Sequence, residues 1–218
     1  MTLPADHDQS DCRSRLIQAA TEVFIEEGYR ASIERVALRA GVARQTLYNH
    51  FPSKADLFGE VIKQATAALL VTLDGKAEGL RERLLRFGIA FRAKALSAEG
   101  LGFYRALIAA TMRFPELAAT FYRTGPAQTA ARLRVVLQEA MDRGELRPGD
   151  SDFATITLLS MLVGAERGHY LLSGEPPPEP DPARVADLID CYLRAFAPLT
   201  PETPAISPFT PASQRSIP

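Results

Sequence analysis

The sequence is poor in the residues that build disulfide frameworks and metal sites, since its 218 residues include two cysteines and three histidines. Cys12 and Cys191 lie far apart without a Cys-x-x-C partner, which predicts reduced thiols and disfavours a zinc site. Cys191 lies in a helical pattern and is expected in the core. No apolar run approaches the ~18–20 residues that span a bilayer, and the acidic N-terminus shows no signal peptide. We therefore expect a cytoplasmic protein with no membrane partner.

Signals for strands and for catalytic centres are also missing. Sustained period-two apolar runs and Asn-Gly or Asp-Gly hairpins are absent, which predicts an all-α fold. No Ser-His-Asp order, nucleophile elbow or glycine-rich phosphate loop occurs, so we expect no catalytic residue, no metal and no cofactor. The net charge of −1 argues against a protein that coats nucleic acid indiscriminately, but not against a specific DNA binder.

Residues 32–51 carry the pattern of a helix-turn-helix. Ser32 stands where an N-cap accepts a backbone hydrogen bond, and Gly41 stands where a helix ends in a left-handed conformation. The apolar stripe of the first helix repeats at helical spacing. It consists of Ile33, Val36, Ala37 and Ala40.

The second helix of this motif presents polar side chains outward. Val42 and Leu47 are expected to anchor it against the first helix. The side chains then left free suit the base edges and phosphates of a duplex. They are Arg44, Gln45, Thr46, Tyr48 and Asn49.

The pattern extends beyond the motif to residues 13–62. An amphipathic helix ending at Gly28 precedes the motif, and a Ser53/Asp56 capping box opens a helix after it. The residues that carry a family resemblance are Ala19-Ala20, Phe24, Gly28-Tyr29, Val36-Ala37, Ala40-Gly41-Val42, Thr46-Leu47-Tyr48, His50-Phe51 and Ser53-Lys54. On these residues the stretch resembles the TetR family of bacterial transcriptional regulators. One departure is Ala43, where the family often has a serine cap, whose loss costs about 1 kcal/mol.

The resemblance implies that some of these residues read bases and others contact the phosphate backbone. Arg44, Gln45 and Asn49 are the candidates for reading bases. The candidates for the remaining DNA contacts, chiefly to phosphate, are Ser32, Thr46, Tyr48, His50 and Lys54. A packing role for His50 stays open, and the other arginines near the motif are expected to be ordinary solvated charges.

Residues 63–197 are expected to form a larger helical domain that binds an effector and dimerises. Phe114-Pro115-Glu116-Leu117-Ala118 and Arg143-Gly144-Glu145-Leu146 resemble TetR/AcrR-type regulatory domains. Aromatic side chains spread over four predicted helices suggest a cavity for a hydrophobic small-molecule effector. The candidate ligand contacts are Phe87, Phe91, Phe103, Leu107, Phe121, Tyr122 and His169.

The resemblance also implies a homodimer built from the last two helices. A row of small residues at i, i+4, i+8 lets another helix approach closely. Such a dimer would hold two recognition helices about 34–36 Å apart on a two-fold symmetric double-stranded operator. The candidate interface residues are Ser160, Gly164, Gly168, Leu188, Tyr192 and Phe196.

The favoured interpretation is a repressor that an apolar or aromatic effector releases from DNA. A DNA-bound interaction module without an effector is one alternative, and a helical metalloprotein using Glu166 and His169 is another. Residues 1–12 are expected to be flexible, and the Pro-rich residues 198–218 to be a disordered tail.

Overall fold

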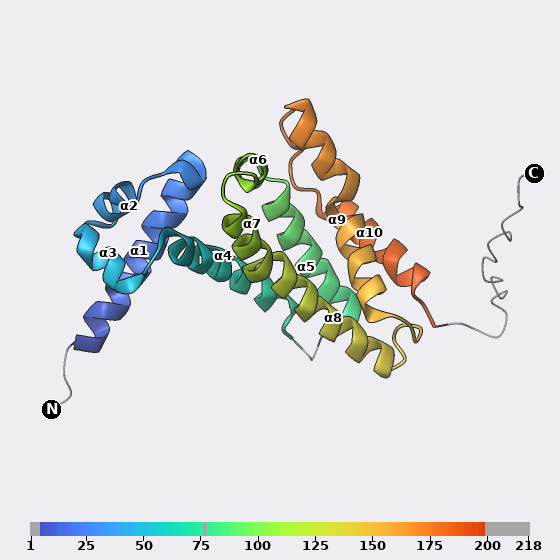
Figure 1. Cartoon of the computed structure of the whole chain (residues 1–218). Helices are drawn as coiled ribbons and strands as arrows, with labels where there is room; N and C mark the ends of the chain where they lie inside the picture. The colour runs from blue at the N-terminus through green and yellow to red at the C-terminus, as the bar shows by residue number, and fades with distance from the viewer. Residues whose placement is uncertain (1–4, 76–77, 199–218) are drawn as a thin grey trace, which may run out of the picture.

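The computed structural model describes residues 5–75 and 78–198, with side chains from residue 11 onward. These residues contain helices and no strands, which confirms the predicted all-α fold (Figure 1). The elements are α1 (Ala5–Glu27), the 3-10 turn η1 (Gly28–Arg30), α2 (Ile33–Ala40), α3 (Arg44–His50), α4 (Lys54–Leu70), the 3-10 turn η2 (Val71–Leu73), α5 (Leu80–Ala95), α6 (Ala98–Thr111), α7 (Pro115–Thr124), α8 (Pro126–Asp142), α9 (Ser151–Ser173) and α10 (Pro182–Ala195).

The chain ends differ from expectation or fall outside the described part. Helix α1 begins at Ala5, so residues 5–12 are helical rather than a flexible arm. Asp11 and Arg15 form an ion pair across one turn of this helix at 3.5 Å, a geometry that supports helix locally. The predicted disordered tail, from residue 199 on, lies outside the described residues. None of the described helices has the length and hydropathy needed to cross a membrane.

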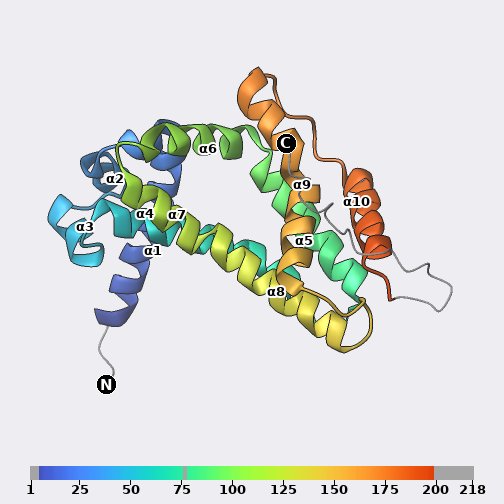
Figure 2. The same cartoon turned by 45° about the vertical axis from the view of Figure 1, so that its right-hand side comes forward.

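Two hydrophobic cores organise the described chain. The first is formed by α1 to α4 and extends to Leu107 on α6 and Leu117 on α7. The second is formed by α5, α8, α9 and α10, with Leu69 and Leu73 reaching it from the end of α4 and from η2. Helix α4 therefore links the two cores, and α6 and α7 pack over the N-terminal one (Figures 1 and 2).

Basic side chains hold the C-terminal end of α4. Arg83 is only 3% exposed, and its guanidinium donates to the carbonyl oxygen of Leu73 from Nε and Nη2 at 3.1 and 2.9 Å. Arg86 donates to two carbonyl groups at the end of η2, and Lys94 to one in α4. Arg132 pairs at 2.7 Å with the carboxylate that follows η2. Helix ends leave carbonyl groups without intrahelical partners, and Arg83 and Arg86 donate to such groups at the end of η2.

At the C-terminal end of the described chain, the burial of three side chains differs from the prediction. Tyr192 is fully buried and donates its hydroxyl to the carbonyl oxygen of Ala154 at 3.1 Å, and Phe196 is also buried. Both therefore belong to the core of one chain and cannot form a dimer surface. Cys191, expected in the core, is exposed.

Candidate nucleic-acid interface

The helix-turn-helix forms as the local sequence predicts. The hydroxyl oxygen of Ser32 accepts a hydrogen bond from the backbone N–H of Arg35 at 3.1 Å, which caps α2. Gly41 ends α2 with φ +68°, a conformation that glycine adopts without steric cost. Leu47 is fully buried beneath α3. These contacts fix the angle at which α3 leaves the turn.

The outward face of α3 is polar and exposed. Arg44, Gln45 and Asn49 are all exposed, as the sequence predicts for base-reading residues. The amide nitrogen Nε2 of Gln45 donates to Oδ1 of Asn49 at 3.1 Å. The Arg44 guanidinium lies 3.0 Å from the carboxylate of Glu34 and 5.4 Å from the ring centre of Tyr48. Amide and guanidinium groups held side by side match the donors and acceptors of a major groove.

Two neighbouring arginines are bound to acids of α1. Arg39 forms a two-pronged pair with Glu26, with both distances 2.8 Å, and this pair lowers the pKa of the Glu26 carboxyl. Arg35 lies 2.6 Å from Glu27. These cations join α2 to α1, so they are ion-paired rather than the ordinary solvated charges that the sequence predicts.

Four of the remaining predicted DNA contacts, Thr46, Tyr48, His50 and Lys54, are less exposed than the base-reading candidates, whereas Ser32 is exposed. Thr46, Tyr48 and His50 are half-buried on α3. The side chain of Lys54, at the start of α4, is directed toward Tyr29. Its ammonium donates to the carbonyl oxygen of Tyr29 and lies 4.2 Å from the centre of the Tyr29 ring. Burial lowers the pKa of Lys54. A phosphate contact by Lys54 would require its side chain to leave this position.

The start of α3 lacks the serine side-chain cap that α2 and α4 have. Ala43 occupies the N-cap position with φ −69° and ψ +148°, and no side chain accepts from the first turn. Ser53 caps α4 by accepting from the N–H of Asp56 at 3.1 Å. The departure at Ala43 therefore leaves N–H groups of the recognition helix open to another acceptor.

The predicted effector residues do not face one common interior. Phe87 and Phe91 stack at 5.4 Å in the second core, whereas Phe103 and Phe121 contact each other at 5.7 Å beside the first. Leu107 is also part of the first core. The helical period placed these rings on inner faces, but it could not tell which core each face joins.

Two further candidates lie at the surface. Tyr122 is 65% exposed and points away from both cores, so it is a wrong prediction for a pocket wall. His169 is exposed and its Nε2 lies 3.0 Å from a carboxylate oxygen of Glu175.

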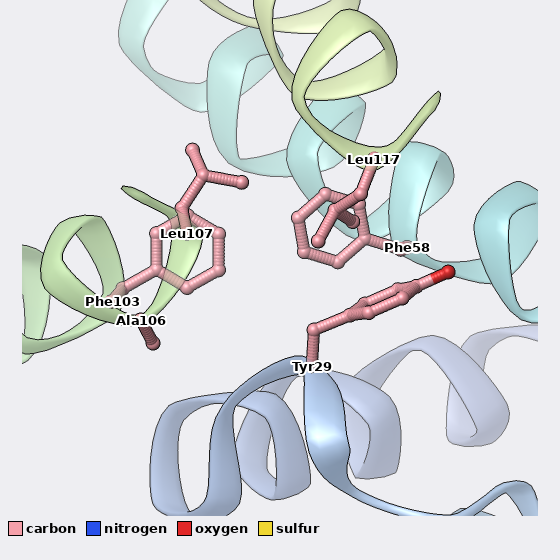
Figure 3. A pocket seen from close by; sticks show the side chains of 6 residues that line it. All are labelled: Tyr29, Phe58, Phe103, Ala106, Leu107 and Leu117. Atoms are coloured by element: carbon pink, nitrogen blue, oxygen red, sulfur yellow. The ribbon is translucent and has the colours of Figure 1, made fainter. Parts of the chain in front are cut away.

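A small cavity does lie where the first core meets α6 and α7. Its volume is about 10 Å³, the space of roughly one water molecule. Figure 3 shows Tyr29 entering from η1, facing Leu117 and Phe58, with Phe103 and Leu107 opposite on α6. Sequence reasoning missed Tyr29, although its place directly after the Gly28 turn puts it between the two parts of the chain.

The small residues of α9 are open, as a helix–helix contact requires. Ser160 and Gly164 are exposed, and a Cβ atom built at Gly164 or Gly168 would meet nothing within 4 Å. Two large apolar side chains of α9, Phe153 and Ile156, are exposed by 60% and 64%. Leu188 on α10 is half-buried.

The two residues of the metal alternative are engaged elsewhere. The Glu166 carboxylate lies 2.6 Å from the guanidinium of Arg92 and also pairs with Arg184, while His169 faces Glu175. Within residues 11–75 and 78–198 the structure contains no group of three His, Cys, Asp or Glu side chains that could hold a metal ion.

Comparisons with known proteins agree with this architecture. Residues 16–61 match the family model of tetR-family bacterial regulatory proteins, and residues 82–198 match the C-terminal domain of AefR-like transcriptional repressors. The transcriptional regulator EthR of Mycobacterium tuberculosis is 31% identical over 192 residues, 82% of this chain and 84% of that protein. The transcriptional activator FasR of Mycolicibacterium smegmatis is 37% identical over 73 residues, 33% of this chain and 30% of that protein.

Solved structures give the same result over most of the chain. A TetR-family regulator from Mesorhizobium loti has a TM-score of 0.70 and 27% identity, covering 86% of this chain and 96% of that one. The flavonoid-responsive regulator FrrA has a TM-score of 0.66 and 29% identity, covering 87% and 98%. The chain therefore belongs to the TetR family of bacterial regulatory proteins, as a DNA-binding transcriptional regulator and not an enzyme.

Proposed function

We propose that this regulator is a repressor that binds a two-fold symmetric operator as a homodimer and leaves it when a hydrophobic aromatic molecule binds. The observation that carries the DNA part is the exposed polar face of α3 above the buried Leu47. Arg44, Gln45 and Asn49 read base edges in the major groove. Tyr48 and His50 contact the phosphate backbone beside them.

The homodimer follows from the outer face of α9. Phe153 and Ile156 leave apolar surface in water, and Gly164 offers room for a neighbouring helix. Packing this face and the adjoining Leu188 of α10 against a second copy would bury them around a two-fold axis. The two α3 helices would then be held at a separation of about 34–36 Å, one turn of the duplex.

The effector part is supported by the relatives and by half-buried aromatics. The C-terminal match is to a repressor domain, and the name of FrrA describes a response to flavonoids, which are planar aromatic molecules. Phe103 and Phe121 contact each other at 5.7 Å and are only half-buried, and they are the side chains that an aromatic effector would contact. Binding would release DNA if the effector favours another separation of the two α3 helices.

Selection from a random duplex library tests the proposal. We expect the selected sequences to contain two half-sites related by two-fold symmetry, and flavonoids or similar aromatics to lower affinity in fluorescence anisotropy. The usual allosteric coupling of about 1–3 kcal/mol corresponds to a 5- to 150-fold loss. Selected sites without symmetry would contradict the dimer, and release by polar metabolites alone would contradict the effector class.

A further inference from the structure

A second and larger depression lies between the DNA-binding helices and the rest of the chain. This interdomain groove has a volume of about 840 Å³, within the range of small-molecule sites. The end of α1, η1 and the start of α4 line one side, and α6 and the start of α7 line the other. It shares Tyr29 and Ala106 with the small cavity of Figure 3.

The floor of the groove is apolar. Gly28 brings η1 so close to α6 that a Cβ atom there would lie 3.4 Å from the Cβ of Ala106. Ala109 and Ala110 continue this face of α6 and leave open space because their side chains are small. The rings of Tyr29 and Phe114, which also line the groove, meet edge to face at 5.9 Å. Such a surface suits a flat apolar body.

The walls of the groove carry cations without acidic partners. Arg30, Lys54 and Arg113 line it, and in the part of the chain that the structure describes no carboxylate forms an ion pair with any of them. The ammonium of Lys54 lies over the Tyr29 ring at 4.2 Å, and the guanidinium of Arg113 over Phe114 at 5.4 Å. Both positive charges therefore lie over aromatic rings of the groove.

Acidic side chains offset these cations only in part. Glu27 lines the groove but is already bound to Arg35 at 2.6 Å. Glu116 is the second carboxylate of the lining, and its charge adds to the burial that raises the pKa of Tyr29. Three cations thus face one uncommitted carboxylate. A half-buried ammonium such as Lys54 that has only neutral partners gains from a ligand anion.

We propose that the interdomain groove binds a small planar aromatic molecule bearing one carboxylate. The ring lies on Ala106 and Ala109 beside Tyr29 and Phe114, and the carboxylate accepts hydrogen bonds from Lys54 and Arg113. Neither of the effector contacts proposed above, Phe103 and Phe121, lines this groove. Because both parts of the chain line the groove, a bound molecule stabilises the relative orientation of the DNA-binding helices and α6.

Binding of 1-naphthoate to the full-length protein, without DNA, tests this site. The chain contains no tryptophan, so the emission of the naphthoate probe is not masked by indole fluorescence. We expect saturable binding, and about tenfold weaker binding of the neutral analogue 1-naphthalenemethanol. Equal binding of the two compounds, or no saturable binding of naphthoate at millimolar concentration, would overturn the proposal.

Matched variants locate the site. Lys54→Gln and Arg113→Gln are each expected to weaken naphthoate binding about tenfold. Their controls, Lys63→Gln on the exposed side of α4 and Arg123→Gln on α7, should leave it unchanged. Ala109→Leu fills the groove from an exposed position and should abolish binding without unfolding the chain, as circular dichroism will show.

The same variants separate this site from a DNA contact. If Lys54→Gln weakens DNA binding but leaves naphthoate affinity unchanged, the ammonium serves phosphate and the groove site is refuted. If Ala109→Leu binds naphthoate like the parent chain, the ligand lies elsewhere and the proposal also fails. Neither outcome depends on whether an effector releases the operator.

Discussion

Replacing Ala43 by Ser should stabilise the recognition helix. The backbone at Ala43 has φ −69° and ψ +148°, close to the φ −66° and ψ +159° of Ser97, which caps α6 by accepting from the N–H of Gly100 at 3.0 Å. A serine hydroxyl at position 43 would thus reach the N–H of Thr46 without backbone movement. Nothing in the first turn of α3 currently fills this role.

The expected gain is about 1 kcal/mol in the free energy of unfolding, the usual value of a serine N-cap over alanine. For a cooperative chain of this size it corresponds to a rise in Tm of about 2–4 °C. Circular dichroism during heating and in urea, without DNA, measures both quantities. The reciprocal change Ser32→Ala should lower stability by a similar amount, because it removes the cap of α2.

A matched control places the same hydroxyl where no free N–H exists. Ala131 is exposed in the interior of α8, so Ala131→Ser should cost up to about 0.5 kcal/mol through lower helix propensity. If Ala43→Ser behaves like Ala131→Ser, the hydroxyl makes no capping bond and the reasoning about the start of α3 is refuted.

Further changes probe the DNA surface, the dimer and pH dependence. Arg44→Ala should relax preference at one position of each half-site by about 1–3 kcal/mol, measured by anisotropy on single-base variants, and a uniform loss on all sequences would contradict base reading. Gly164→Leu should weaken dimerisation by about 1–3 kcal/mol in sedimentation experiments while leaving the fold of each chain intact, since a side chain there has open space; an undisturbed dimer would place the interface elsewhere. Arg81 lowers the pKa of Asp190, so the stability difference between the parent chain and Asp190→Asn should be constant above about pH 5 and shrink as the pH falls below the ordinary value of 3.8. Urea titrations at several pH values measure it, and a difference that grows in acid would have the wrong sign.

Local signals predicted the DNA-binding half well. The Ser32 cap, the Gly41 terminus and the buried stripe of α2 are set by residues within one or two turns of each other, and the structure confirms all three. The missing cap at Ala43 was readable for the same reason. The orientation of the Lys54 side chain could not be predicted in this way, because it depends on a contact with Tyr29, which is 25 residues away in the chain.

The regulatory half was predictable only as a set of helices. Periodicity shows that Phe87 and Phe103 face inward, but the packing of α5 and α6 decides that they enter different cores. Similarly, the stripe on α10 contains both Leu188 and Tyr192, and only the contact with Ala154 on α9 shows that the tyrosine is internal. Such contacts join segments far apart in the chain, and single-sequence patterns carry no information about them.

The basic side chains around the end of α4 tie this end of the helix to α5 through hydrogen bonds to carbonyl groups. With its 17 residues, α4 is about 25 Å long. If Arg83, Arg86 and Lys94 keep their carbonyl partners, a tilt of about 5° moves the opposite end, and α3 with it, by about 2 Å. In a two-fold dimer both arms would move, so the spacing of the two recognition helices would change by up to about 4 Å in about 34 Å. A tilt of α4 by about 5° is therefore enough to bring both recognition helices out of register with a rigid duplex.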